Sequence, residues 1–515
     1  MAELLLEFFS EEIPARMQAN AEADLKRLFL KELDEARLEY GEVKTFSTPR
    51  RLTLVVDGLP TAQPDLKDER RGPRVDAPEK AVEGFLRGCD LTSVDQLEQR
   101  EEKKGTFYYA VIEKTGLPVN GLLLDMISGI VKNFPWPKSQ RWGSGSLRWV
   151  RPLHSILCRF DGETVEGEID GVYLGGSTRG HRFMASNLID VVDFADYQQK
   201  LRDAFVMLDP AERRQSIEKA AQQLCADQGL ELVDDQALLA EVAGLVEWPT
   251  PILGKIDDSF MALPGEVMVS EMREHQKYFA VKNAKTGELL PYFVCTSNMI
   301  AKDGGELIRR GNERVLSARL YDAKFFWDQD LKQPLENNLA KMSQIVFHIK
   351  LGTVADRIER MRGLVRVLAP MIADCDVRLV DRAAQLAKAD LVSGMVGEFP
   401  DLQGVMGQYY AKAQGEDEAV ANAIADHYLP KGQGDSVPTA PISVAVALAE
   451  KIDTLVGFFS IDEKPTGSKD PFALRRAALG VIRLIVENGL RLSLKGLFDR
   501  ARINYEQQGV AVEDA

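Results

Sequence analysis

The sequence predicts a multidomain α+β protein, with a mixed α/β region over residues 1–335 and an all-α region over residues 336–515. The chain has 515 residues, enough for about three domains of roughly 100–200 residues each. In its first part, short apolar runs of strand length alternate with helical patterns. After about residue 312 the strand-like runs disappear, and helical periodicity continues to the end.

The first 60 residues predict a strand, a helix and two further strands. Residues 4–9 are a short apolar run, as in a buried strand. Pro14 opens a helix that Gly41 is expected to end. The apolar stripe of this helix consists of Met17, Ala21, Leu25, Leu28, Phe29, Leu33 and Ala36. Strands are expected over 43–46 and 52–56, around a turn at Pro49.

The rest of the mixed region continues this alternation. Residues 64–78 are polar and contain prolines, so a loop or linker is expected there. Further helices are expected over 79–89, 119–133, 194–226 and 235–246, and further strands over 107–112, 250–255 and 278–296. Residues 139–173 predict strands and turns. The last pattern is a helix over about 496–505, followed by an acidic tail.

Composition excludes several classes of protein. The net charge is −15, which argues against indiscriminate binding to nucleic acid or anionic membranes but allows a local basic patch. Five scattered cysteines form no C-x-x-C pair, as expected for reduced thiols in a cytosol. The acidic N-terminus does not match a signal peptide, and no apolar run reaches ~18 residues. We therefore expect a cytoplasmic protein without a membrane span.

Basic residues cluster at 126–160, a stretch that contains no Asp or Glu. Three tryptophans, at 136, 142 and 149, are interleaved with the cations. Cations neutralise phosphates and aromatic rings stack on bases, so the pattern suits RNA. The alternative is that the tryptophans belong to the core and the arginines lie on a sheet edge.

Two shorter basic clusters follow. The segment TRGHRF contains Arg179, His181 and Arg182, and residues 308–320 contain Arg309, Arg310, Arg314 and Arg319. Arg310 and Arg314 share one helical face. A solvated helix with Glu306 and Glu313 as ion-pair partners explains the second cluster equally well.

The stretch PTGSKDPFALRRAALG, residues 465–480, resembles a phosphate loop but is not a P-loop. A P-loop requires G-x-x-x-x-G-K-[ST], and Asp462 stands where its first glycine should be. Asp470 is expected to cap a helix that begins at Pro471. Its packed face is expected to contain Leu474, Ala477, Ala478 and Ile482. Lys469, Arg475 and Arg476 then either bind RNA phosphate or pair with local acids.

Taken together, ten segments resemble the β subunit of the bacterial heterotetrameric glycyl-tRNA synthetase, in the order of that family and over almost the whole chain. They are EFFSEEIPARM (7–17), TPRRLTLVV (48–56), SQRWGSGSLRWVRPLH (139–154), TRGHRFM (178–184), EVAGLVEWPTPILGKI (241–256), MREHQKYFAV (272–281), GNERVLSARLYDAKFFW (311–327), LGTVADRIERM (351–361), QGVMGQYYA (403–411) and PTGSKDPFALRRAALG (465–480).

The resemblance implies a tRNA-binding subunit that works with a separate α subunit in an α2β2 enzyme. The α subunit carries the aminoacylation site, so this chain is expected to have no catalytic residues and no bound cofactor. ATP and Mg are substrates of the complete enzyme, and tRNA(Gly) rather than DNA is the nucleic acid. The N-terminal region is similar to the editing-type domain of the phenylalanyl-tRNA synthetase large subunit. The family usually continues into a helical anticodon-binding domain, which this chain is expected to lack.

The helical region is similar to the HD phosphohydrolase fold, whose active members hold a metal with a His-Asp dyad. At the dyad position this sequence has Ala389 and Asp390, and Glu450 corresponds to the later aspartate. Alanine cannot ligate a metal, and His427 alone rarely holds one. No metal site is therefore expected.

The arginines and lysines of the basic segments are the predicted RNA-binding set. Its members are Arg50, Arg51, Lys138, Arg141, Arg148, Arg151, Arg179, Arg182, Arg309, Arg310, Lys469, Arg475 and Arg476. Two alternative functions remain open at this point: an HD-type metal-dependent phosphohydrolase, and a non-catalytic assembly scaffold.

Overall fold

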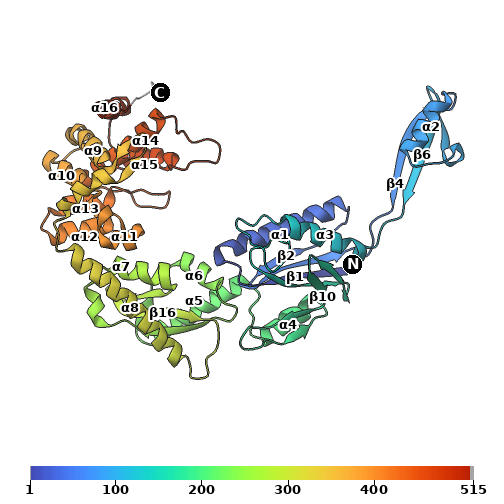
Figure 1. Cartoon of the computed structure of the whole chain (residues 1–515), viewed down its shortest axis with the longest axis horizontal. Coiled ribbons are helices and arrows are strands. Elements are labelled where there is room, and N and C mark those ends of the chain that lie inside the picture. Colours follow the sequence, from blue (N-terminus) through green and yellow to red (C-terminus); the bar gives the residue numbers. More distant parts are fainter. Residues whose placement is uncertain (1, 511–515) are drawn as a thin grey trace. The chain divides into compact units, whose positions relative to one another are not determined.

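The computed structural model describes residues 2–510, and only the backbone of 66–68 and 112–114. The chain divides into two units (Figure 1). The first consists of Met1–Leu253 and Val294–Ile308, and the second of Gly254–Phe293 and Arg309–Ala515. The predicted acidic tail lies beyond residue 510, outside the described residues. None of the described helices is long and apolar enough to cross a membrane.

The first unit is built on a sheet with the strand order β2-β3-β1-β7-β10-β9, and β8 pairs with β7. The central strand β1 is antiparallel to both β3 and β7, so that Phe9 lies opposite Arg51 on one side and Ser155 on the other. The strands are β1 (Ala2–Ser10), β2 (Val43–Ser47), β3 (Arg51–Leu59), β7 (Leu153–Phe160), β8 (Glu163–Thr164), β9 (Gly167–Ile169) and β10 (Val172–Gly175).

Helices cover both faces of this sheet, which explains why β1 is buried on both faces and mainly apolar rather than alternating. Its even-numbered residues pack beneath α1 (Ala15–Glu35) and α3 (Val119–Asn133). On the opposite face, Leu5 packs with Val55, Leu157 and residues of α4 (Phe194–Asp203) (Figure 1). The predicted end of the first helix at Gly41 is wrong: α1 ends at Glu35, because Arg37 adopts a left-handed φ of 57°.

Residues 66–114 form a small module with a core of its own. The sheet order is β4-β6-β5, and helix α2 packs on it through Val82 and Leu86. The elements are β4 (Leu66–Arg74), α2 (Glu79–Gly88), the 3-10 helix η1 (Val94–Gln96), β5 (Glu98–Glu102) and β6 (Gly105–Lys114). The loop predicted over 64–78 is therefore wrong, since most of it is strand β4.

The first unit also contains short strands and helices around the main sheet. The hairpin β11 (Ser177–Arg179) and β12 (Leu188–Asp190) pairs Thr178 with Ile189. The single helix predicted over 194–226 is two helices, because Phe205 adopts a φ of 61°. The further elements are α5 (Pro210–Ala226), β13 (Leu230–Leu232), α6 (Gln236–Ala243) and β14 (Thr250–Lys255), of which β14 runs on into the second unit.

The second unit begins with residues that the sequence assigns to the mixed region. Ser270 donates to the Asp401 carboxylate at 2.8 Å, and the Tyr409 hydroxyl donates to Glu266 at 2.8 Å. These elements are η2 (Asp258–Ala262), α7 (Gly265–Ser270), the π-helical turn η3 (Glu271–Gln276), β15 (Phe279–Asn283), β16 (Leu289–Ser297) and α8 (Glu306–Asp330). The end of β16 and the first three residues of α8 belong to the first unit.

The predicted boundary after residue 335 does not coincide with this division. The C-terminal residue of α8, Asp330, accepts hydrogen bonds from the amides of Gly394 and Met395 at 2.9 Å. It also accepts one from the Tyr410 hydroxyl at 2.8 Å. These long-range bonds tie α8 to the helical region, so a boundary at 335 would cut through a bonded core.

The remainder of the second unit is helical, as predicted after residue 335, around the almost wholly buried helix α14. Its elements are η4 (Leu335–Gln344), β17 (Val346–His348), β18 (Gly352–Thr353), α9 (Val354–Leu368), η5 (Ala369–Met371), α10 (Val377–Leu386), η6 (Ala389–Val392), α11 (Gly394–Glu398), η7 (Pro400–Leu402), α12 (Val405–Ala413), α13 (Glu418–Asp426), α14 (Pro441–Ser460), α15 (Leu474–Glu487) and α16 (Leu494–Gln507).

Helix α15 starts three residues later than predicted. Ala473, with a φ of 56°, precedes it, and Asp470 caps it from a distance by accepting from the amides of Leu474 and Arg475. The buried face contains Leu474, Val481 and Leu484. Ile482, which was expected to pack, is 52% exposed.

Candidate nucleic-acid interface

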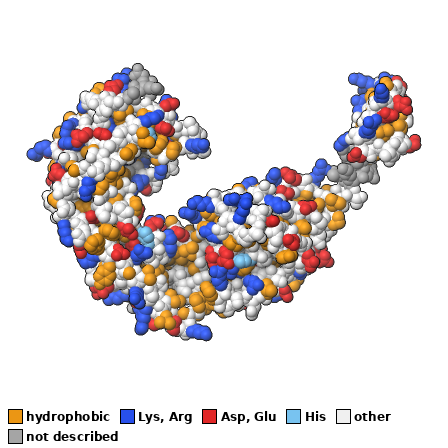
Figure 2. Space-filling view, viewed as in Figure 1, with side chains coloured by type: hydrophobic (Ala, Val, Ile, Leu, Met, Phe, Trp, Pro, Cys, Tyr) orange, Lys and Arg blue, Asp and Glu red, His pale blue; other side chains and the backbone are white. Residues whose placement is uncertain are grey.

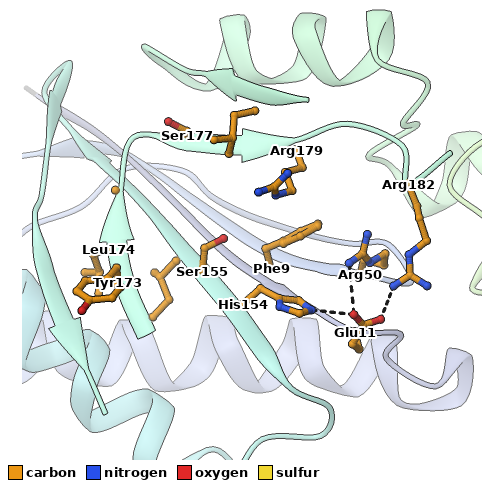
Figure 3. A pocket seen from close by; sticks show the side chains of 13 residues that line it. Phe9, Glu11, Arg50, His154, Ser155, Tyr173, Leu174, Ser177, Arg179 and Arg182 are labelled. Atoms are coloured by element: carbon orange, nitrogen blue, oxygen red, sulfur yellow. Dashed lines mark hydrogen bonds and ion pairs between the residues drawn. The ribbon is translucent and has the colours of Figure 1, made fainter. Parts of the chain in front are cut away.

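A cavity of about 650 Å³ in the first unit brings together three arginines of the predicted set, Arg50, Arg179 and Arg182. It lies where β1 ends, β3 and β7 begin, and β10 and β11 pass alongside (Figure 3). The pairing of β1 with its two neighbours places Phe9 at the floor. Two segments that are distant in sequence, residue 50 just before β3 and residues 179–182 at the end of β11, therefore present their cations to one space.

Glu11 organises the rim of this cavity (Figure 3). Its carboxylate forms an ion pair with Arg182, lies 2.8 Å from His154 Nε2 and lies 3.7 Å from Arg50 Nη2. Burial alone would raise the pKa of Glu11, but the bonds from His154 and Arg182 and the charge of Arg50 outweigh it. They lower the pKa to about 2. Glu11 therefore keeps the positive charges of the rim close together, and Glu12 forms a second ion pair with Arg182 at 2.7 Å.

The guanidinium groups of Arg50 and Arg179 form weaker contacts within the protein than that of Arg182. The Arg50 guanidinium stacks 4.5 Å from the centre of the Phe9 ring, a cation–π contact. Arg179 donates to the carbonyl oxygen of Ser186 at 3.1 Å, and Figure 3 shows its side chain directed into the cavity between Phe9 and Ser177. Both guanidiniums retain N–H groups that a phosphate oxygen could accept from.

Arg51 does not belong to this rim, although it was predicted to bind RNA. Its side chain is wholly buried. Arg51 forms an ion pair with Glu247, and its Nε lies 3.2 Å from Glu7 Oε2 without the angle of a hydrogen bond. It also donates to the carbonyl of Arg179. Arg51 is thus a positioning residue beneath the cavity, enclosed where no phosphate reaches it.

Further hydrogen bonds complete the network around Arg51. Glu7 accepts from the hydroxyls of Thr178 and Tyr197, each at 2.6 Å, and Glu247 accepts from Thr48 at 2.7 Å. Burial disfavours the charge of Arg51, but Glu247 and Glu7 outweigh it and raise its pKa. The network joins β1, β3 and β11, and so it fixes the backbone that carries Arg50 and Arg179.

The basic stretch at 138–151 lies apart from the cavity, in the loop between α3 and β7. Trp149 is wholly buried, and Trp136 and Trp142 pack against the same core, so the interpretation of the tryptophans as core residues is confirmed. Lys138, Arg141 and Arg148 are exposed and Arg151 is half-buried. Arg148 donates to Ser139 at 3.2 Å, and Arg151 donates to the carbonyl of Val150 at 2.9 Å.

The family model described as the glycyl-tRNA synthetase beta subunit matches residues 4–514. This chain belongs to that family. Three relatives named glycine–tRNA ligase beta subunit agree. The one from Ruegeria sp. (strain TM1040) is 55% identical over 510 residues, which are 97% of this chain and 74% of the relative. The one from Paracoccus denitrificans (strain Pd 1222) is 53% identical over 98% of this chain and 74% of the relative. The one from Rhodospirillum centenum (strain ATCC 51521 / SW) is 51% identical over 98% and 74%.

The glycyl-tRNA synthetase beta subunit family therefore accounts for nearly the whole chain. The family belongs to an aminoacyl-tRNA synthetase, and the name of the subunit implies an alpha partner and a tRNA substrate. On the face drawn in Figure 2, basic and acidic side chains are interspersed, in keeping with the net charge of −15. An RNA site on such a surface has to be a local patch.

The remaining predicted residues of this family member lie in the second unit. Arg309 pairs with Glu313 at 2.6 Å on α8, as the solvated-helix interpretation requires, and Arg310 lies on the same helix. Arg475 donates to the carbonyl of Gly467 at 2.7 Å, and Lys469 is exposed in the tight turn before α15. Arg476 lines a second cavity, described below.

The phosphohydrolase alternative finds no support. Asp390 is buried and accepts from the amides of Gly404 at 2.5 Å and Gly407 at 3.0 Å. Burial raises its pKa to about 6 against these bonds. His427 is buried, with Nδ1 2.6 Å from the carbonyl of Ile424. Among the described side chains, no three of His, Cys, Asp or Glu gather as a metal requires.

Sequence reasoning missed the residues that make the first cavity a site. Glu11 and His154 are 143 positions apart, and their contact depends on the pairing of β1 with β7. The only local signal was the acidic pair Glu11-Glu12 directly after a buried strand. Such a pair reads as ordinary solvated surface until its partner arginines are known.

Proposed function

We propose that this chain is the tRNA-binding β subunit of glycine–tRNA ligase, and that the cavity around Glu11 is one of its contacts with the RNA backbone. The observation that carries the proposal is the convergence of Arg50, Arg179 and Arg182 on one space in a member of this family. Cations in a concave site attract phosphates, and arginine suits them because its planar fork donates two parallel hydrogen bonds. The cavity would hold the RNA backbone by electrostatic attraction and position it, and this chain would not carry out the chemical step.

The wider arrangement is part of the same proposal. The α subunit would carry the aminoacylation site and use ATP and Mg to activate glycine, in an α2β2 enzyme of the cytoplasm. The first unit would share the fold of the editing-type domain of the phenylalanyl-tRNA synthetase large subunit, and the helical region that of HD domains. The mixed sheet with helices on both faces and the helical part of the second unit are compatible with these folds.

A salt titration of tRNA(Gly) binding to the α–β complex tests the proposal. For the wild-type complex, log K should fall linearly with log salt concentration, because RNA binding releases counterions. Arg50→Ala combined with Arg179→Ala should weaken binding and reduce the slope by about one for each lost phosphate contact. Arg27→Ala, an exposed arginine on α1 away from the cavity, is the matched control and should change neither quantity.

Two outcomes would redirect the proposal. An unchanged slope in the double variant would show that the cavity does not contact phosphate. If the wild-type chain binds the α subunit fully but adds nothing to the tRNA affinity of the complex, the assembly scaffold is favoured instead. Glycylation assays with Arg151→Ala, Arg182→Ala and Arg476→Ala then show which basic patches matter for the reaction.

A further inference from the structure

The second unit contains a cavity of about 510 Å³ that nothing in the proposed function uses. It lies between α9, α14 and the first turn of α15, with residues 428–431 on one side and β17 on another. Small-molecule sites in proteins measure roughly 300–1,000 Å³. The space is therefore large enough for an organic ligand, and its chemistry indicates which kind.

Cations outnumber acids in the lining. Arg357, Lys431, Lys451 and Arg476 line the cavity, and Glu450 is the one acid among the described lining residues. A cavity of this composition carries excess positive potential, which concentrates anions. The question is which of these charges are already neutralised by the protein.

Glu450 forms ion pairs with one lining cation, Arg357, and with Lys388, which is not among the lining residues. Arg357 Nη2 lies 2.7 Å from the Glu450 carboxylate, and Lys388 Nζ approaches the same carboxylate at 3.5 Å from below. Burial alone would raise the pKa of Glu450, but these two charges outweigh it and lower the pKa. Lys451 donates to three successive backbone carbonyls, the nearest being that of Leu429 at 2.9 Å. These groups form the floor of the cavity.

Lys431 and Arg476 are different. Within residues 2–510, neither side chain forms a hydrogen bond or an ion pair, and Lys431 Nζ only stands 5.7 Å from the Tyr428 ring. The charges of Arg475 and Arg476 contribute to lowering the pKa of Asp470. Its carboxylate, however, is bonded to the amides at the start of α15. Two cations thus remain available at the mouth of one cavity, enough to balance a phosphate dianion.

Helix α15 strengthens this site. Its N-terminal residues Ala473, Arg476 and Ala477 line the cavity, so the start of the helix borders the same space, while Asp470 accepts from its first two amides. The helix has 14 residues, long enough for the dipole to matter. A helix N-terminus beside unpaired cations is a favourable place for phosphate.

Aromatic rings form the rest of the wall. Phe458 and Phe472 stack with their centroids 4.1 Å apart and their planes at 21°, and Tyr428 lies against Lys388 at 3.7 Å. Phe347, Tyr428, Phe458 and Phe472 all line the cavity. Flat apolar faces next to cations suit a base joined to a phosphate. Gln403, also in the lining, offers both a donor and an acceptor for a base edge.

We propose that this cavity binds a nucleoside 5′-phosphate, with the phosphate held by Lys431 and Arg476 and the base against the aromatic wall. The ligand is either a free nucleotide or a nucleotide within an RNA strand, since both present the same group. The proposal concerns binding without hydrolysis, and it does not depend on the role of the first cavity.

Calorimetric titration of the α–β complex with AMP, adenosine and inorganic phosphate tests the site with free ligands. The wild-type complex should bind AMP. The double variant Lys431→Gln/Arg476→Gln should have an affinity for AMP that is lower by about tenfold or more, because charged hydrogen bonds are lost. Phe472→Leu should lower the affinity for AMP by about fivefold or more and leave the affinity for inorganic phosphate unchanged, because only base stacking is lost. Arg378→Gln, a 91% exposed arginine on α10, is the matched control.

Filter binding with a short 5′-phosphorylated RNA forms the second arm. Weakened RNA binding in the Lys431/Arg476 double variant, without any heat from AMP, identifies the source as an RNA strand. Heat from AMP with unchanged RNA binding identifies a free nucleotide. No AMP binding at about 1 mM together with unchanged RNA binding overturns the proposal. Equal binding of phosphate and AMP, insensitive to Phe472→Leu, also overturns it. The Arg50/Arg179 variant should leave AMP binding intact, which separates this test from that of the first cavity.

Discussion

Arg50 and Arg51 are neighbours in the chain, yet they experience opposite environments. Arg50 stands at the rim of the first cavity, stacked on Phe9 and 3.7 Å from a partly exposed carboxylate. Arg51 is wholly buried beneath it between two buried carboxylates. Successive side chains at the start of a strand point to opposite faces, so one step along the backbone separates a ligand-facing cation from a structural one.

The difference teaches that charge type alone does not distinguish a binding residue from a structural one. Burial raises the cost of leaving a charge unpaired, so Arg51 should matter for stability. Arg50 keeps access to solvent and should matter for binding. Substitutions that change one property and leave the other intact test this division.

The largest expected effect is on stability. Arg51→Met leaves Glu7 and Glu247 as buried charges without a cation, and should destabilise the first unit by about 3–5 kcal/mol. Denaturant unfolding followed by tryptophan fluorescence measures it, because Trp149 lies in the core of this unit. Arg27→Met on α1 is the control and should lie within about 0.5 kcal/mol of wild type. A stable Arg51→Met variant with weakened tRNA binding would show instead that Arg51 contacts RNA.

A moderate effect is expected at the rim. Glu11→Gln removes the negative charge that competes with phosphate for Arg50 and Arg182. We expect tRNA(Gly) affinity at low salt to rise about fivefold, corresponding to ~1 kcal/mol for a unit charge pair at 4 Å in water. Filter binding measures it, and Glu35→Gln on the exposed face of α1 is the matched control. A fall in affinity would indicate that Glu11 is needed to hold the arginines in place.

The smallest effect concerns the pH dependence of stability. The pKa of Glu11 is about 2 in the folded chain and about 4.3 when unfolded. Because the folded value is lower, Glu11 stabilises the fold above pH ~4.3, and this contribution disappears as pH falls towards 2. Wild type should exceed Glu11→Gln in Tm at pH 7 by the equivalent of less than about 1 kcal/mol. That gap should narrow as pH falls below about 4.3 and close only as pH approaches 2, and a gap independent of pH would refute the assignment.

Local patterns predicted much of the fold, because burial leaves a periodic trace in the sequence. Strand β1 and helix α3 lie close to where apolar periodicity placed them. Strand β4 was missed because it is polar: its sheet is covered by one helix only, and Phe85 packs over Gly72, where any Cβ would collide with the ring. When the apolar side chains of a small core belong mainly to neighbouring elements, the strand beside them contains few apolar residues and shows no apolar periodicity.

The candidate sites were predictable in composition but not in geometry. Arg50, Arg179 and Arg182 were identified as basic residues, and their convergence follows from strand pairings between distant segments. The same pairings buried Arg51, which the sequence could not distinguish from Arg50. Asp470 was identified as a cap, but the left-handed Ala473 moved the start of α15 past Pro471.

The small module of residues 66–114 leaves and re-enters the first unit at nearly the same point. The backbone amide of Gln63 donates to the carbonyl of Leu117 at 2.9 Å, and that of Val119 donates to the carbonyl of Thr61 at 3.0 Å. Ala62 and Pro118 form an isolated antiparallel β-bridge between these segments. The strands approach so closely that a Cβ on Gly116 would meet the Gln63 carbonyl. A segment whose two ends already touch is a removable cassette: joining residue 63 to residue 117 by a short turn would excise it with little disturbance of the surrounding chain.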